Sequence, residues 1–179
     1  KGCTPEIMAE AIGASLIPLL EMVAPHLVLV QGDTSSAFAA ACTADSLGIP
    51  VGHVEAGLRS FNMAMPEEVN RILTDRISQW LFTPTAAAAA HLRAEGAADG
   101  RIAPVGDVMY DVAMQHGARV DATGGALSRL GLGAGGYVLA TVHRAENTDD
   151  VSRLAAIVDA LEDVARQMPV VWPLHPRTR

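Results

Sequence analysis

The sequence is poor in several residue types, and each shortage narrows the possibilities. Aromatic residues make up only 4% of the 179 residues, so a core must be built from Ala, Val, Leu and Ile, which favours helices packed on a sheet. The two cysteines, Cys3 and Cys42, have no metal-ligand or redox spacing, which predicts reduced thiols and no metal site. Thirteen basic against twenty acidic residues give a net charge of −7, which argues against a broad nucleic-acid surface.

Long hydrophobic runs are also lacking, and this bears on membranes and export. No stretch has the length of a membrane span, and the first residues lack the layout of a signal peptide. We therefore expect a cytoplasmic protein that binds neither membrane nor nucleic acid. An anionic small ligand stays possible, because the field in a pocket can differ from that of the whole protein.

Short apolar runs alternate with helical patterns over the first two thirds of the chain. The sequence predicts strands at 26–31, 49–55, 81–83 and 101–105, and helices at 4–24, 34–47, 66–81, 85–95 and 107–116. Pro66 stands at a first helical position, where proline is common, whereas Pro18 is expected to kink or split its helix. The alternation predicts an α/β fold with a parallel, doubly wound sheet and helices on both faces.

A glycine-rich segment separates this region from a second alternation. We predict a first domain at 1–118, a linker or crossing at 119–136 with a short helix near 126–130, and the start of a second, truncated domain at 137–179. Strands are expected at 137–142 and 169–174, with a helix at 148–167 between them. The glycines at 133–136 precede a strand, so they do not form a dinucleotide-binding loop, which follows one.

Polar residues at the carboxyl ends of the predicted strands are candidates for a site, because ligands of parallel sheets bind there. Asp33 follows the first strand, and both a helix cap and a catalytic role stay open for it. Glu55 ends the second strand, and both a role in the site and a surface salt bridge stay open for it. His53 lies within that strand, and we expect it to be buried and hydrogen-bonded in a structural role.

Other candidates begin helices or follow the later strands. Glu67 and Glu68 stand in a first helical turn, where the helix dipole favours a carboxylate and would keep Glu67 ionised as a base. His143 and Arg144 leave one strand, and His175 leaves the next. Cationic and donor groups in such places suit a phosphate.

Taken in order, these segments resemble the non-hydrolysing UDP-N-acetylglucosamine 2-epimerase family. The matching stretches are 30–34 (VQGDT), 52–60 (GHVEAGLRS), 65–71 (MPEEVNR), 105–107 (VGD), 141–147 (TVHRAEN) and 173–176 (PLHP). The resemblance implies two Rossmann-like domains of the GT-B type facing each other across a deep cleft. It also implies a further strand before Lys1 and most of the second domain after Arg179.

The resemblance also implies a reaction and roles for the residues. The family inverts C2 of UDP-N-acetylglucosamine to give UDP-N-acetylmannosamine through a 2-acetamidoglucal intermediate, as a homodimer without NAD or metal. Asp33, Glu55 and Glu67 match its catalytic carboxylates, and His143 matches the histidine placed against the diphosphate. The expected substrate contacts are His143, Arg144, Glu146, Asn147 and His175.

Several alternatives stay open beside this interpretation. A hydrolysing epimerase, a glycosyltransferase of the GT-B type and an inactive sugar-nucleotide-binding remnant would share the same fold. In members activated by a second UDP-N-acetylglucosamine, the positions of Glu67, Arg144 and His175 border the allosteric site. Ala145 stands where many bacterial members have Arg, and the loop before Pro66 is shorter, so an altered regulatory site is expected.

Overall fold

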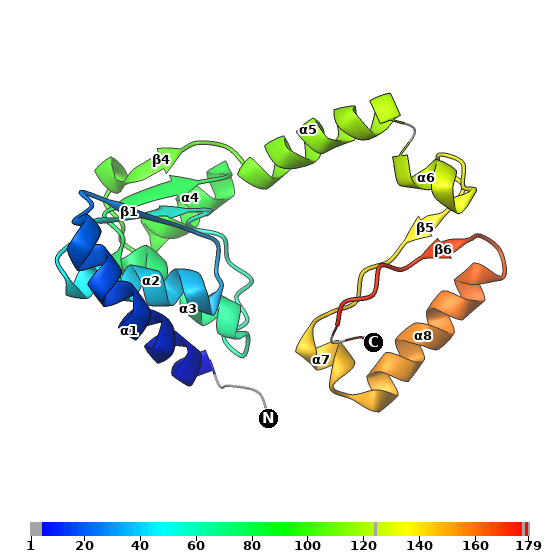
Figure 1. Cartoon of the computed structure of the whole chain (residues 1–179), viewed down its shortest axis with the longest axis horizontal. Helices are drawn as coiled ribbons and strands as arrows, with labels where there is room; N and C mark the ends of the chain where they lie inside the picture. Colours follow the sequence, from blue (N-terminus) through cyan, green and yellow to red (C-terminus); the bar gives the residue numbers. More distant parts are fainter. Residues whose placement is uncertain (1–4, 124, 177, 179) are drawn as a thin grey trace. The chain divides into compact units, whose positions relative to one another are not determined.

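The chain forms two compact units in the computed structural model, which describes residues 5–123, 125–176 and 178. The first unit is Lys1–Val112 and the second is Ala113–Arg179 (Figure 1). The helix α5 (Val108–Thr123) runs through this division. It continues beyond the helix expected at 107–116 and passes through Gly117, a residue that a helix interior tolerates at a cost of about 1 kcal/mol relative to Ala. The domain boundary near 118 stays a prediction.

The first unit contains a four-stranded parallel sheet, as the alternation of elements predicts. Its strands lie in the order β1-β2-β3-β4, with β1 (Val28–Gln31), β2 (Val51–Val54), β3 (Trp80–Thr83) and β4 (Ile102–Pro104). The connecting segments contain α2 (Ser35–Ser46), α3 (Pro66–Ile77), α4 (Ala86–Ala94) and the short 3₁₀ helix η1 (Asp99–Arg101). The helix α1 (Pro5–Val23) precedes β1 and packs against α2.

The described helices α2, α3 and α4 all cover the same face of this sheet. Val30, His53, Leu81 and Ile102 are register partners across the four strands and so point to one face. On that face, alanines of α2 and Ile77 of α3 pack with Val30, and residues of α4 pack with Leu81 and Ile102. The expectation of helices on both faces is wrong for the described residues, because a strand order that never reverses keeps right-handed crossovers on one side.

The opposite face of the sheet is partly open among the described residues. Leu29 of β1 is 59% exposed and Trp80 of β3 is 43% exposed. Gly52 lies between the side chains of Leu29 and Phe82, and a Cβ at this glycine would come within 2.6 Å of Leu29. Apolar residues therefore line both faces of the strands, as is usual in parallel sheets, although only one face is covered by α2, α3 and α4.

The structure decides between alternatives for two details of the helices. Thr34, rather than Asp33, is the N-cap of α2, since its side chain accepts a hydrogen bond from the Ala37 N–H at 3.3 Å. Of the two outcomes expected for Pro18, a kink or a split, the split is not observed, since α1 is one helix. Proline removes the hydrogen bond to the carbonyl four residues earlier, and that residue, Ala14, is exposed, so water can take the place of the missing donor.

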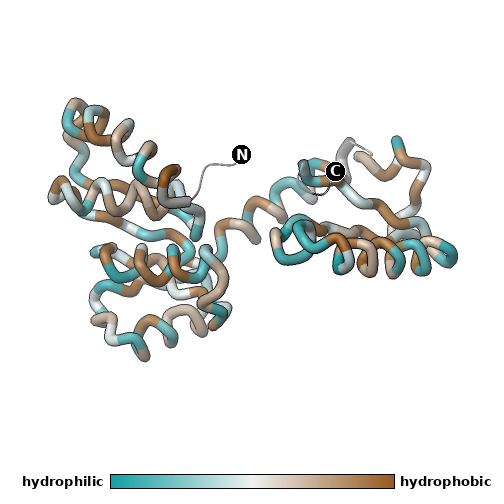
Figure 2. The backbone as a smooth tube through the Cα atoms, turned by 90° about the horizontal axis from the view of Figure 1, so that it is seen from below, coloured by the Kyte–Doolittle hydropathy of each residue, from teal (hydrophilic) through white to brown (hydrophobic). Residues whose placement is uncertain are grey.

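The second unit contains a smaller parallel pair, β5 (Val138–Leu139) with β6 (Val170–Val171). Between them lie α7 (Ala145–Thr148) and α8 (Val151–Ala165), and α6 (Gly125–Leu130) precedes β5. Hydrophobic and hydrophilic residues alternate along α8 in Figure 2. Its half-buried positions include Leu154, Ile157, Val158 and Leu161, which have the spacing of an amphipathic helix. No helix in the described part of the chain is long and apolar enough to cross a membrane.

Candidate functional site

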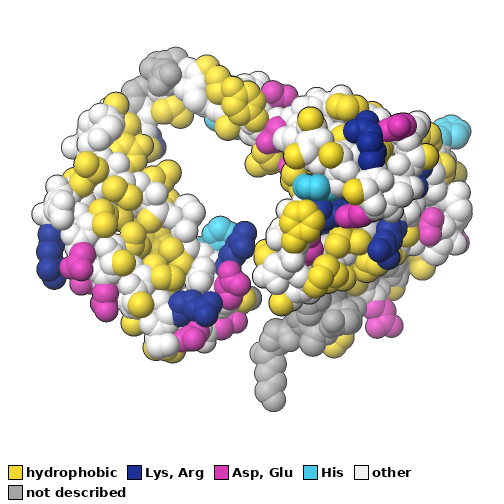
Figure 3. All heavy atoms as spheres, turned by 180° about the vertical axis from the view of Figure 1, so that it is seen from behind, with side chains coloured by type: hydrophobic (Ala, Val, Ile, Leu, Met, Phe, Trp, Pro, Cys, Tyr) yellow, Lys and Arg dark blue, Asp and Glu magenta, His cyan; other side chains and the backbone are white. Residues whose placement is uncertain are grey.

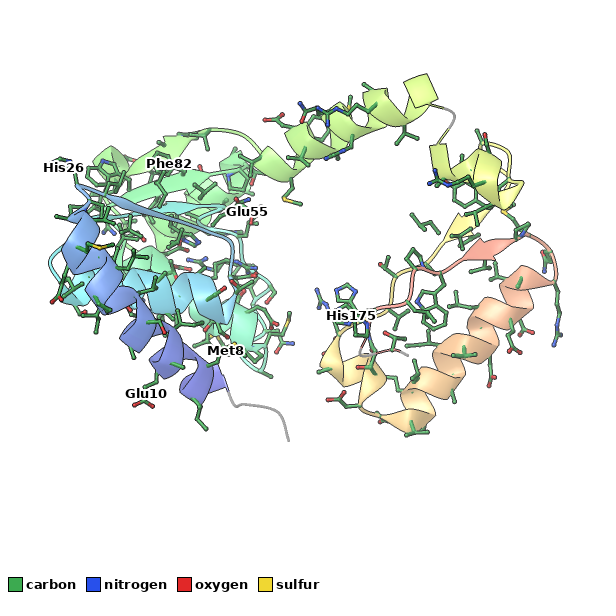
Figure 4. The ribbon with its side chains drawn as sticks, viewed as in Figure 1. Met8, Glu10, His26, Glu55, Phe82 and His175 are labelled. Atoms are coloured by element: carbon green, nitrogen blue, oxygen red, sulfur yellow. The ribbon has the colours of Figure 1, made fainter. Side chains whose placement is uncertain are left out.

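Two predicted carboxylates lie at the same edge of the first sheet. β1 and β2 pair in parallel, so Asp33, just beyond β1, and Glu55, just beyond β2, emerge at neighbouring carboxyl ends. Glu55 Oε2 lies 3.2 Å from the position that a Cβ would take on Gly32, so the Glu55 carboxylate rests against the residue that precedes Asp33. Figure 4 shows Glu55 at the end of its strand. This edge is where ligands of parallel sheets bind.

Glu55 has an unusual backbone conformation for this position. Its φ is +71°, a left-handed value that costs a non-glycine residue about 1–2 kcal/mol. Such outliers gather at functional sites, where the surrounding structure holds them. The Ala56 N–H donates to the Phe82 carbonyl at 3.1 Å, and Ala56 is fully buried, so the residue after Glu55 is anchored to β3 and holds this conformation.

The helix α3 holds Asp33 at two points. The guanidinium of Arg71 pairs with the Asp33 carboxylate, and the Asn70 side-chain amide donates to the Asp33 carbonyl oxygen at 3.0 Å. Arg71 also reaches Glu68 at 2.9 Å between Nη1 and Oε2. One arginine therefore links two carboxylates, which fixes the Asp33 side chain and leaves it 29% exposed.

The adjacent residues Glu67 and Glu68 lie in opposite environments. Glu67 is exposed in the first turn of α3, as an available acid or base requires. Glu68 is only 1% exposed, and its carboxylate accepts the N–H groups of Ser60 and Phe61 at 2.9–3.1 Å. Burial by itself would raise the pKa of Glu68, but these hydrogen bonds and Arg71 together lower it below its ordinary value. Glu68 therefore fixes the loop after β2, a role that the helix-dipole interpretation missed.

Beneath this edge lies a buried polar cluster. His53 is fully buried, which confirms the expected buried, hydrogen-bonded histidine. Its Nδ1 lies 2.6 Å from Asp75 Oδ1 and its Nε2 lies 2.9 Å from the Gly32 carbonyl oxygen. Asp75 also accepts the Gly57 N–H at 3.1 Å and pairs with Arg59 at 2.7 Å. The cluster therefore ties α3 to the ends of both β1 and β2.

The second unit brings its two predicted histidines together. The rings of His143 and His175 have centroids 5.7 Å apart, and both side chains are exposed. They follow β5 and β6, which are parallel neighbours, and Figure 4 shows His175 in the segment after β6. A paired set of exposed ring nitrogens at two strand ends can donate to an anionic group.

Arg144, Glu146 and Asn147 lie on or next to the short helix α7. Arg144 is its N-cap residue, 60% exposed, with Nη1 4.0 Å from Glu146 Oε1. Asn147 is half-buried, and its N–H bonds to the Arg144 carbonyl. The helix expected at 148–167 begins later, at Val151, because Asp150 caps α8 through the Ser152 and Arg153 N–H groups. His143 and Arg144 therefore precede the short helix α7 instead of the long helix α8.

Charged side chains of both signs are interspersed among the described residues. On the face drawn in Figure 3, Lys and Arg side chains lie among Asp and Glu side chains. Among the residues that the structure describes, no three His, Cys, Asp or Glu side chains converge as a metal site would require.

Sequence reasoning missed the residues that hold the carboxylates in place. Arg71 and Asn70 contact Asp33 from 37–38 residues away, and Asp75 contacts His53 from 22 residues away. No local pattern marks such pairs. The one available signal is the three-residue spacing of Glu68 and Arg71, which suits an ion pair on a helix and is observed.

Comparisons with known proteins point to one family. A model of the UDP-N-acetylglucosamine 2-epimerase family matches residues 4–179. The UDP-2,3-diacetamido-2,3-dideoxy-D-glucuronate 2-epimerase of Pseudomonas aeruginosa is 53% identical over 159 residues, covering 87% of this chain and 43% of that protein. The UDP-N-acetylglucosamine 2-epimerase of Methanococcus maripaludis is 42% identical, covering 86% of this chain and 43% of that protein.

A solved structure agrees with these relatives. The crystal structure of the Methanocaldococcus jannaschii UDP-GlcNAc 2-epimerase, in complex with UDP-GlcNAc and UDP, superposes with a TM-score of 0.87 at 36% identity. The match covers 99% of this chain and 49% of that one. The chain thus spans about half the length of the proteins it matches.

Proposed function

Because the chain belongs to the UDP-N-acetylglucosamine 2-epimerase family, we propose that the protein inverts C2 of UDP-N-acetylglucosamine without hydrolysing it. The product is UDP-N-acetylmannosamine. The observation that carries this proposal is the pair of carboxylates, Asp33 and Glu55, at neighbouring strand ends. Inversion at carbon requires removal of a proton from one face and delivery to the other, and two positioned acid–base groups supply both.

The proposed reaction proceeds by elimination and re-addition of UDP. A carboxylate removes the C2 proton while the C1–oxygen bond to UDP breaks, and the electron pair of the C2–H bond forms the double bond of 2-acetamidoglucal. C2 then takes a proton on the opposite face as UDP returns to C1. Asp33 and Glu55 are assigned to proton transfer at C2. Glu67, exposed at the start of α3, is the third carboxylate of the set.

The residues of the second unit are assigned to the nucleotide. UDP leaves as an anion, so donors that meet the developing charge on its diphosphate lower the barrier. His143 and His175 present neighbouring rings, and Arg144 offers a fork suited to phosphate oxygens. Glu146 and Asn147 complete the proposed substrate contacts. The homodimer that the resemblance implies stays a prediction.

A second candidate substrate has a specific observation in its favour. Identity is higher to the Pseudomonas aeruginosa enzyme, at 53%, than to the Methanococcus maripaludis one, at 42%. The name of the former describes a glucuronate that carries two acetamido groups. The same C2 inversion on UDP-2,3-diacetamido-2,3-dideoxy-D-glucuronate is therefore the alternative, since C2 and the leaving UDP are common to both substrates.

Incubation of the complete protein in deuterated water tests the proposal. Each of the two nucleotide sugars is supplied separately, and NMR follows deuterium at C2 and the C2-inverted product. Deuterium in both epimers, with the nucleotide sugar conserved, is the expected result for the true substrate. Free UDP that accumulates in step with free sugar would indicate a hydrolysing epimerase, and no deuterium with either substrate would rule out epimerisation.

Variants separate catalysis from folding. Asp33→Asn and Glu55→Gln are each expected to lower kcat by about 100-fold or more, the scale of general acid–base catalysis. Asp99→Asn is the matched control, because Asp99 pairs with Arg93 in a mostly exposed ion pair and should leave kcat unchanged. Wild-type activity in either site variant would remove that residue from the proposed mechanism.

A further inference from the structure

The buried cluster around His53 engages both nitrogens of the imidazole ring. His53 Nε2 lies 2.9 Å from the Gly32 carbonyl oxygen, which can only accept, so this nitrogen donates. His53 Nδ1 lies 2.6 Å from the Asp75 carboxylate. Both ring nitrogens of His53 therefore have a partner, and these partners lie in different segments of the chain.

Asp75 is also held at its other carboxylate oxygen. That oxygen receives Arg59 Nη2 at 2.7 Å and the Gly57 N–H at 3.1 Å. Arg59 is in turn held by Glu95 through two contacts of 2.7 Å. Every polar side-chain atom of His53 and Asp75 therefore has a partner, which fixes both side chains.

The pair contacts the backbone next to each proposed acid–base residue. Through His53, Asp75 holds the carbonyl of Gly32, the residue before Asp33. Directly, it holds the N–H of Gly57, two residues after Glu55. Gly32 and Gly57 have φ values of +73° and +79°. The pair is therefore hydrogen-bonded to two positions at which the backbone takes a left-handed conformation.

We propose that His53 and Asp75 are positioning residues that set the spacing between the Asp33 and Glu55 carboxylates. The inference rests on the proposed function, since it assigns the pair a part in that reaction. Both residues are almost fully buried, at 0% and 3% exposed, and they act through Gly32 and Gly57 without reaching substrate. A misplacement of about 1 Å in a catalytic group can cost about 100-fold in rate. Two residues that fix the backbone beside both catalytic groups are therefore expected to have a large effect on kcat.

The hydrogen bond from His53 to Gly32 is tested in the unaltered complete protein, whatever its substrate. Nitrogen-15 NMR of the imidazole of His53 is expected to show a proton on Nε2, because only a protonated nitrogen can donate to the Gly32 carbonyl oxygen. An unprotonated Nε2 would overturn the contact through which the pair holds Gly32, and this result does not depend on any enzymatic activity.

The positioning role is tested by kinetics in deuterated water. Asp75→Asn removes the charge but retains an oxygen for Gly57, and it is expected to lower kcat about 10- to 100-fold, with KM changed by less than about threefold because no substrate contact is lost. Asp99→Asn, the same change in an exposed ion pair, is expected to leave kcat unchanged.

A second pair of variants covers the case in which Asp75→Asn does not fold. His53→Leu keeps the side-chain volume but cannot donate to Gly32, whereas His53→Gln can. The Gln variant is expected to keep more of kcat than the Leu variant. Wild-type kcat in His53→Leu, or equal losses in both variants, would overturn the positioning role. Absence of C2 exchange in the unaltered protein would instead overturn the proposed function and, with it, the reaction that the pair serves.

Discussion

Replacing Gly57 by alanine is expected to destabilise the first unit strongly. The φ of Gly57 is +79°, a left-handed value that costs an alanine about 1–2 kcal/mol. A Cβ at this position would also lie 2.3 Å from the Ala88 carbonyl oxygen and 2.9 Å from Leu92 Cγ. Both atoms belong to α4, so the helix and the loop must separate by about 1 Å before ordinary contact is restored.

The backbone cost and the steric cost add, because the first arises within residue 57 and the second between the loop and α4. Overpacking of this kind costs about 1–3 kcal/mol, so Gly57→Ala should lower the free energy of unfolding by about 2–5 kcal/mol in total. The shift would also disturb the hydrogen bond from the Gly57 N–H to Asp75 and the contact between the Gly57 carbonyl and His91 Nδ1, at 3.1 and 3.0 Å. The loop that carries Glu55 would move with them.

Gly96→Ala is a matched control. Gly96 has a φ of +90°, but no heavy atom lies within 4 Å of the position of a Cβ there, so only the backbone cost of about 1–2 kcal/mol applies. Thermal unfolding followed by circular dichroism should show a fall in Tm of about 10 °C for Gly57→Ala and about 4–5 °C for Gly96→Ala, at about 2–4 °C per kcal/mol. Equal shifts for the two variants would refute the argument from contact with α4.

Glu68, Thr34 and Cys42 each allow a further testable prediction. Because the folded-state pKa of Glu68 lies below its ordinary value of 4.5, its stabilising effect is present above about pH 4.5 and is lost as the pH falls through the lower folded value. Glu68→Gln should therefore lower the free energy of unfolding by about 2 kcal/mol at pH 7. In urea unfolding, the variant's stability should also depend less on pH in the acid range, and an unchanged pH dependence would argue against this role of Glu68. Thr34→Ala should cost about 1 kcal/mol and speed amide exchange in the first turn of α2, whereas Asp33→Asn should leave that exchange unchanged if Thr34 is the cap. Burial and the neighbouring Asp45 raise the pKa of Cys42 above its ordinary value of 9.0, so in a Cys3→Ser background its alkylation should be slower at pH 8 than that of free cysteine and should still be increasing above pH 9.

The elements were predictable because they depend on local patterns. Apolar runs at 26–31 and 49–55 predict strands, and the observed β1 and β2 lie within these ranges. Pro66 predicts the first turn of α3, where it stands. The positions of Asp33 and Glu55 at strand ends follow directly, since they require only the order of residues along the chain.

The expected sheet coverage was wrong for the described residues, and the open question of the helix cap was decided by the structure. Helices on both faces require a strand order that reverses, and the order β1-β2-β3-β4 does not. The choice between Asp33 and Thr34 as cap depends on one residue of register, which composition does not reveal, because both side chains are good caps.

What the sequence alone determined is an α/β chain of the epimerase family, with carboxylates at the ends of its first two strands and histidines after its later ones. Only the tertiary structure decided how those carboxylates are held. Arg71 with Asp33 and Asp75 with His53 join segments that are far apart along the chain, and Glu68 binds the loop at Ser60, eight residues before it. Their contacts arise when α3 packs against the sheet, and no repeating pattern of residues encodes where that helix lies.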